Sequence, residues 1–93
     1  MEEKFLNAWF SARKDAEELG VRLRPLLREQ AMEQAHRQLS GSRDSDGFGT
    51  LQSLGRLDLS LEALAINKQF TALFSDEEAN NALMRLVDSG YGF

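Results

Sequence analysis

Apolar residues recur at intervals of three and four over most of this chain, and glycines interrupt the pattern. Such spacing places apolar side chains on one face of an α-helix, whereas a half-buried strand requires alternation. The first segment with this spacing covers residues 2–19, starts with two glutamates and is followed by Gly20. Acidic residues suit the positive end of the helix dipole, and glycine commonly ends a helix. The pattern therefore predicts an α-helix over residues 2–19.

Three later segments have the same apolar spacing and carry signals of where a helix starts. Pro25 fits the first turn of a helix, because its missing N–H would have no partner there. Ser60 is a suitable N-cap, and Ser75 with Glu78 three residues later forms a capping-box pattern. We therefore predict helices over residues 25–39, 61–74 and 76–89.

Turn-forming residues are concentrated between residues 41 and 50, which predicts one loop rich in glycine and aspartate. Residues 51–59 are ambiguous. Leucines there fit a short helical turn, but leucines from residue 57 onward also alternate with polar residues, as in a strand. We interpret this stretch as an extended approach to the next helix, since a lone strand would have nothing to pair with.

A chain of 93 residues with 42% hydrophobic content has room for a single core. Together with the helical spacing, this predicts an all-α protein in which residues 1–93 form one small domain. We expect about four helices arranged as two helical hairpins, joined by the loop at 41–50.

The formal net charge is −4, and the excess of acid lies in residues 41–93, which hold four basic and eight acidic side chains. Binding to nucleic acid depends on basic side chains that displace counterions, so we expect no nucleic-acid partner. There is no cysteine, which suits a reducing cytoplasm, and no apolar run long enough to span a membrane. We therefore expect a cytoplasmic protein with no membrane partner.

Several large apolar side chains lie off the main stripe of their helix or at the end of the chain. Exposed apolar and aromatic side chains on a small domain are typical of partner sites, and arginines add polar contacts around such a site. We predict a partner-binding surface made of Leu6, Phe10, Arg22, Arg24, Arg28, Tyr91 and Phe93.

Residues 44–51 resemble the front half of an EF-hand calcium loop in their acids, glycine and aliphatic residue. The fifth position of that pattern is Phe48, and the twelfth, where the family has a bidentate glutamate, is Gly55. The resemblance implies a weak calcium site at most. The matching residues are Asp44, Asp46, Gly49 and Leu51.

Residues 79–91 resemble the recognition helix and exit of a winged helix-turn-helix domain, and residues 59–65 resemble the preceding helix. This resemblance implies DNA binding or regulation through the helix at 76–89. The first turn of that helix is acidic, however, and would repel phosphates.

No motif for catalysis, phosphate binding or a histidine or cysteine metal site is present in the sequence, so we expect neither enzyme activity nor a cofactor. The sequence favours a small non-enzymatic helical module that binds another protein or itself. An adaptor, an inhibitor, an immunity-type protein and a homodimer all remain open. The alternatives are the DNA-binding protein and the weak calcium-binding module described above.

Overall fold

The computed structural model describes residues 1–91, and every regular element in that range is helical. The α-helices are α1 (Glu2–Glu18), α2 (Ala31–Ser40), α3 (Phe48–Ser53), α4 (Leu61–Ala65) and α5 (Asp76–Asp88). Short 3₁₀ turns at Arg28–Gln30, Leu57–Leu59 and Thr71–Leu73 precede or follow them. The all-α class and the single small domain are therefore confirmed.

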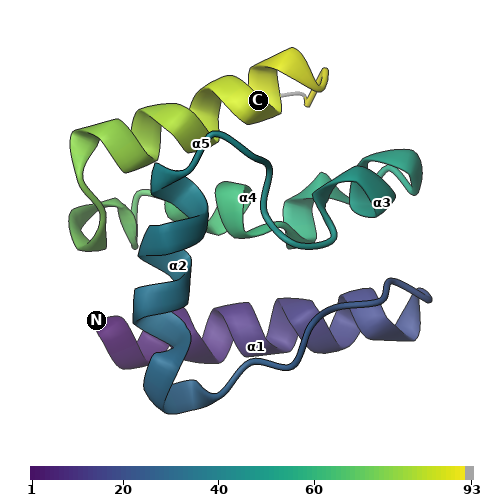
Figure 1. The fold of residues 1–93 in the computed structure, drawn as a ribbon, viewed down its shortest axis with the longest axis horizontal. Coiled ribbons are helices and arrows are strands. Elements are labelled where there is room, and N and C mark those ends of the chain that lie inside the picture. The colour runs from purple at the N-terminus through teal and green to yellow at the C-terminus, as the bar shows by residue number, and fades with distance from the viewer. Residues whose placement is uncertain (92–93) are drawn as a thin grey trace.

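The helices lie in three tiers (Figure 1). Figure 1 shows α1 in the lower tier, α3 and α4 in the middle and α5 in the upper tier. Helix α2 runs upright from the lower tier to the upper one, across the direction of α1 rather than alongside it. The connection between α1 and α2 is correspondingly long, and its residues 19–27 are called the linker below.

The core consists of two neighbouring clusters of buried side chains. In the larger cluster, the Phe5 ring of α1 meets Phe70 and Phe74 edge to face, with ring centroids 5.5 and 5.2 Å apart. The smaller cluster contains Phe48 and Leu51 of α3, and Ile66 packs against both clusters. Phe48 is 1% exposed, so the aromatic residue of the predicted loop anchors the start of α3 in the core.

Both predicted helix caps are confirmed. The Ser60 hydroxyl accepts the backbone N–H of Ala63 at 3.1 Å and starts α4. At α5 the Ser75 hydroxyl accepts the N–H of Glu78, and the Glu78 carboxylate accepts the N–H of Ser75. These bonds satisfy N–H groups that the first turn of a helix leaves unpaired.

The second and third helices are shorter than predicted. Residues 24–27 are extended, and α2 starts at Ala31 instead of Pro25, because contacts described below hold the backbone of Arg24. The predicted helix 61–74 ends at Ala65, since the Asn67 side chain accepts the backbone N–H of Gln69 and forms a turn. That turn allows two phenylalanines to reach the Phe5 ring.

Residues 51–59 are helical turns and not an extended approach. Helix α3 continues through Ser53, the backbone turns at Gly55, and the 3₁₀ turn at Leu57–Leu59 follows. Leu51 and Leu57 are 2% and 5% exposed, so burial of both in the smaller cluster accounts for this conformation.

A buried ionic network joins α4, α5, the end of α2 and the loop at 41–47. The fully buried Glu62 carboxylate accepts hydrogen bonds from the backbone N–H and the hydroxyl of Ser45. It also accepts one from Arg85, whose Nη1 lies 3.2 Å from Glu62 Oε2. Arg85 also donates to the carbonyls of Gln38, Leu39 and Gly41. One arginine therefore neutralises the buried carboxylate and caps the C-terminal end of α2.

Glu62→Gln should lower the free energy of unfolding by about 3 kcal/mol, because it leaves the buried Arg85 charge unpaired. Urea unfolding followed by circular dichroism measures the change. Glu33→Gln is the matched control, since its pair with Arg37 is exposed on both sides and should contribute less than about 1 kcal/mol. Equal losses in the two variants would contradict a structural role for the buried pair.

Residue 47 favours glycine because of its backbone conformation and because the linker side chains lie close to it. Gly47 has φ +80°, and a Cβ there would lie 2.6 Å from Leu23 Cδ2 and 3.1 Å from Val21 Cγ1. We expect Gly47→Ala to cost about 1–2 kcal/mol and to lower the melting temperature.

Gly49→Ala is the control for this substitution. Gly49 lies in α3, and a Cβ there would meet nothing within 4 Å in the described chain, so alanine should stabilise the helix slightly. Thermal unfolding of both variants checks the pair of expectations. A harmless Gly47→Ala would show that the linker does not pack this closely.

The capping box at α5 also pairs with α2 through His36, whose Nδ1 lies 2.8 Å from Glu78 Oε2. Burial acts to raise the pKa of the Glu78 carboxyl, but the hydrogen bonds from Ser75 and His36 outweigh it and lower that pKa below its ordinary value. The ionised carboxylate therefore stabilises the fold, and this contribution is lost as the pH falls through the lowered pKa.

Glu78→Gln should destabilise the protein by about 1 kcal/mol at neutral pH. The difference from the wild type should shrink as the pH falls through the lowered pKa of Glu78, because the native carboxyl then becomes protonated itself. Thermal unfolding between neutral and acid pH tests this, with the exposed neighbour substitution Glu77→Gln as control. A difference that stays constant with pH would rule out the charged carboxylate as its cause.

Candidate functional site

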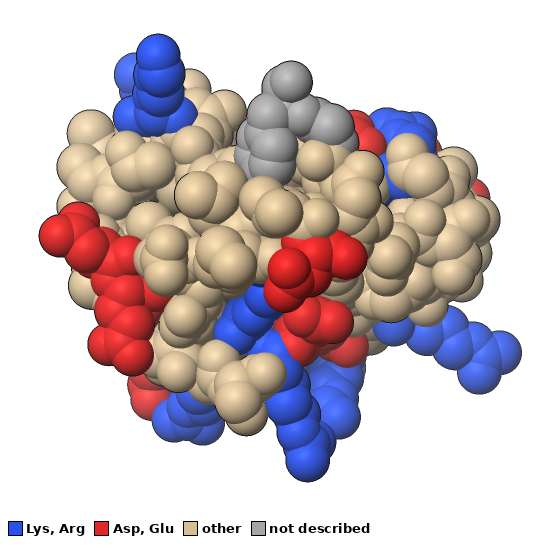
Figure 2. Space-filling model, turned by 90° about the horizontal axis from the view of Figure 1, so that it is seen from above, with Lys and Arg blue, Asp and Glu red and all other residues tan. Residues whose placement is uncertain are grey.

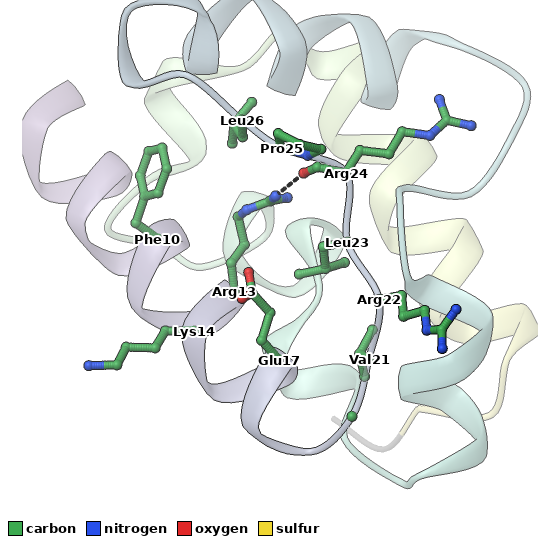
Figure 3. A pocket seen from close by; sticks show the side chains of 11 residues that line it. Phe10, Arg13, Lys14, Glu17, Val21, Arg22, Leu23, Arg24, Pro25 and Leu26 are labelled. Atoms are coloured by element: carbon green, nitrogen blue, oxygen red, sulfur yellow. Dashed lines mark hydrogen bonds between the residues drawn. The ribbon is translucent and has the colours of Figure 1, made fainter.

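A groove of about 850 Å³ separates the C-terminal half of α1 from the linker (Figure 3). Phe10, Pro25 and Leu26 provide apolar surface in it. Figure 3 shows Lys14 extending outward from α1, and Arg22 and Arg24 extending from the linker on the side away from α1, while all three still line the groove. The groove, called the linker groove below, therefore combines an apolar surface with basic side chains on both edges.

A second hollow of about 1000 Å³ continues from the linker groove toward α2 and the loop at 41–47. The two share one wall, formed by residues 24–26 and Arg13. The second hollow adds Arg37 and Arg43, together with two aspartates of the loop. The two hollows thus border the linker on either side, and their linings together make up a concave surface.

This concave surface is basic although the chain is acidic. Six basic side chains line it against three acidic ones, which gives the surface a formal charge of +3 on a chain of −4. The six are Arg13, Lys14, Arg22, Arg24, Arg37 and Arg43, and the three are Glu17, Asp44 and Asp46.

Two side chains hold the backbone of the linker in place. Arg13 donates to the carbonyl oxygen of Arg24, and Asp46 Oδ2 accepts the N–H of Arg24 at 2.7 Å. The Arg13 guanidinium also lies over the ring of Trp9, 5.9 Å from its centroid. Burial lowers the pKa of Arg13, while Asp46 and Glu17 act to raise it. Arg13 and Asp46 are therefore structural, and Lys14, Arg22 and Arg24 offer their charges to solvent.

Phe10 and Arg28 form one unit at the end of the linker groove. The Arg28 guanidinium lies 5.7 Å from the centroid of the Phe10 ring and donates to Asn7 Oδ1 at 2.7 Å. Phe10 is half-buried and packs against the larger core cluster. The arrangement keeps part of an aromatic ring next to solvent with a cation above it.

The structure brings together four of the seven predicted partner-binding residues. Phe10, Arg22 and Arg24 line the linker groove, and Arg28 adjoins it. Leu6 was predicted to be a surface anchor, but it is 8% exposed and belongs to the larger core cluster. The physical reason is that α1 packs against α2 and α4 at once, so its buried arc is wider than one stripe.

Of the two predicted residues at the C-terminus, only Tyr91 is among the described residues, and it does not line this site. Tyr91 is half-buried and packs against the smaller core cluster. Phe93 lies outside the described residues.

The two aspartates proposed as calcium ligands do not lie together in a metal site. Asp46 accepts a hydrogen bond from the N–H of Arg24, and Asp44 is exposed to solvent. Within residues 1–91, no group of three or more histidine and carboxylate side chains is placed to hold a metal ion. The geometry of this loop therefore favours a structural role for Asp46.

The surface of α5 gives no support to the predicted contact with the phosphate backbone of DNA. Its single basic residue, Arg85, points inward to Glu62, and Asp76, Glu77 and Asp88 are exposed. Among the described helices, none is long and apolar enough to cross a membrane.

The sequence interpretation missed Arg13 and Lys14 in the groove and the inward position of Arg85. The position of Arg13 four residues after Trp9 was an available signal, because side chains at that spacing meet on one helix face. Arg85 follows Ala82 by three residues and Glu78 by seven, so it lies along the buried stripe.

Comparisons with models of known protein families, with curated proteins and with solved structures found no match to this chain.

Proposed function

We propose that this chain is a non-enzymatic interaction module that binds an acidic segment of another protein in the linker groove. The observation that carries the proposal is the concentration of positive charge around an apolar surface on a protein whose net charge is negative. Such a contrast attracts and orients an acidic partner and disfavours basic ones. A cytoplasmic location belongs to the same proposal.

The groove offers two kinds of contact. Arg22 and Arg24 are exposed, and their guanidinium groups suit bidentate hydrogen bonds to carboxylates. Phe10 and Leu26 offer apolar surface between the charged edges, which would accommodate a leucine or phenylalanine of the partner. The preferred ligand is therefore an acidic peptide segment that carries a central apolar residue.

A fluorescent synthetic peptide in which aspartate and glutamate flank a leucine–phenylalanine pair tests this proposal. We expect fluorescence anisotropy to show binding that weakens as the salt concentration rises from about 0.05 to 0.3 M. The single tryptophan, Trp9, lies under Arg13, so its emission should change on binding. The double substitution Arg22→Glu and Arg24→Glu should weaken binding by roughly tenfold or more.

The control is Lys4→Glu with Lys68→Glu, which changes the net charge by the same amount at exposed lysines outside both hollows. Equal effects of the two double variants would mean that only the net charge matters, and would overturn the assignment to the linker groove. Binding of duplex DNA in preference to the acidic peptide at low salt would favour the nucleic-acid alternative instead.

A further inference from the structure

The outer face of α5 exposes three apolar side chains close together. Leu83, Met84 and Val87 are 39%, 48% and 50% exposed. The buried face of α5 consists of Glu78, Ala82 and Leu86, with Arg85 beside them. The pairing of Arg85 with Glu62 fixes this rotation of α5 and turns the other stripe outward.

Acidic side chains stand at both ends of this apolar stripe. Asp76 precedes Leu83 by seven residues, and Asp88 follows Met84 by four, so both share the outer face with the stripe. Glu77 adjoins Asp76 in the first turn, and all three acids are exposed. Figure 2, which views the molecule from above α5, shows a broad uncharged area with acidic side chains next to it, and Lys and Arg side chains at its margin.

We propose that the outer face of α5 is a second docking surface, which binds a basic amphipathic helix of a partner protein. Charge complementarity identifies this occupant. The stripe has acids at both ends, and the single basic residue within Asp76–Asp88, Arg85, points inward to Glu62. Leu83 and Val87 are four residues apart, and Met84 and Val87 three, so the stripe offers both side-chain ridges on which a second helix can pack.

Other occupants fit less well. A second copy paired through α5 would bring the acids of the two copies together, which is unfavourable. An anionic membrane surface would be repelled by Asp76, Glu77 and Asp88. The surface also differs from the linker groove in the sign of its charge, so the two would select partners of opposite charge.

The test uses a fluorescent amphipathic helical peptide made of leucine and lysine at helical spacing. A peptide of the same composition with the spacing scrambled, and a leucine–glutamate peptide, are measured beside it. We expect fluorescence anisotropy to show that the full chain binds the amphipathic basic peptide at least about tenfold more tightly than either comparison peptide.

Met84→Gln with Val87→Gln should weaken this binding by about tenfold and leave the thermal unfolding near that of the wild type, because both side chains are about half exposed. Leu19→Gln with Leu54→Gln is the matched control, since these leucines are 43% and 46% exposed outside α5 and should not affect it. Equal affinity of the Met84/Val87 variant and the wild type, or equal binding of the scrambled peptide, would overturn the proposal.

Two further measurements separate this surface from its alternatives. Arg22→Glu with Arg24→Glu should weaken binding of the acidic peptide by roughly tenfold or more and leave binding of the basic helix intact, so the two proposals can fail independently. Sedimentation of the chain alone reports self-association. A dimer that disappears in the Met84/Val87 variant would identify a second copy as the occupant and would overturn the proposal of a basic partner.

Discussion

The buried pair of Glu62 and Arg85 determines how α4, α5, the end of α2 and the loop at 41–47 fit together. A carboxylate removed from water carries a large desolvation penalty, and two donor groups of Ser45 together with the guanidinium of Arg85 offset it here. The other donors of Arg85 satisfy the carbonyls at the end of α2. The network thereby fixes both the position of the loop at 41–47 and the rotation of α5 about its axis.

The same arrangement separates the charges of the molecule. Asp46 follows Ser45 in the loop and accepts the N–H of Arg24, so the loop that satisfies Glu62 also holds the linker. Basic side chains then gather on both sides of the linker, while three acids stand on the outer face of α5. An acidic chain thus has one basic surface and one acidic surface, and the two proposed docking sites rest on this separation.

Local signals in the sequence were sufficient to predict the features that depend on neighbouring residues. The start of α4 at Ser60 and the capping box at Ser75 depend on a hydroxyl and an N–H three residues away, and both were predicted. The apolar stripe of α1 likewise predicted its extent to within one residue. The all-α class followed from these elements.

Features that depend on contacts between distant segments were not predicted. The linker is extended because Arg13 and Asp46 bind the backbone of Arg24 from eleven and twenty-two residues away, whereas Pro25 alone suggested a helix. Leu6 was assigned to the surface on the premise that α1 packs one stripe against one neighbour, whereas α1 contacts α2, α4 and the turn at Leu57–Leu59. The rotation of α5 depends on a partner of Arg85 that lies twenty-three residues away.

The short helices of the middle tier have a consequence for the motions of this protein. Helices α3 and α4, of six and five residues, are far below the length at which a helix persists alone in water. They exist because α1 and α5 enclose them, so their backbone amides should exchange with solvent only when a whole core cluster opens. The cooperative unit of this molecule is therefore the packed cluster and not the individual helix.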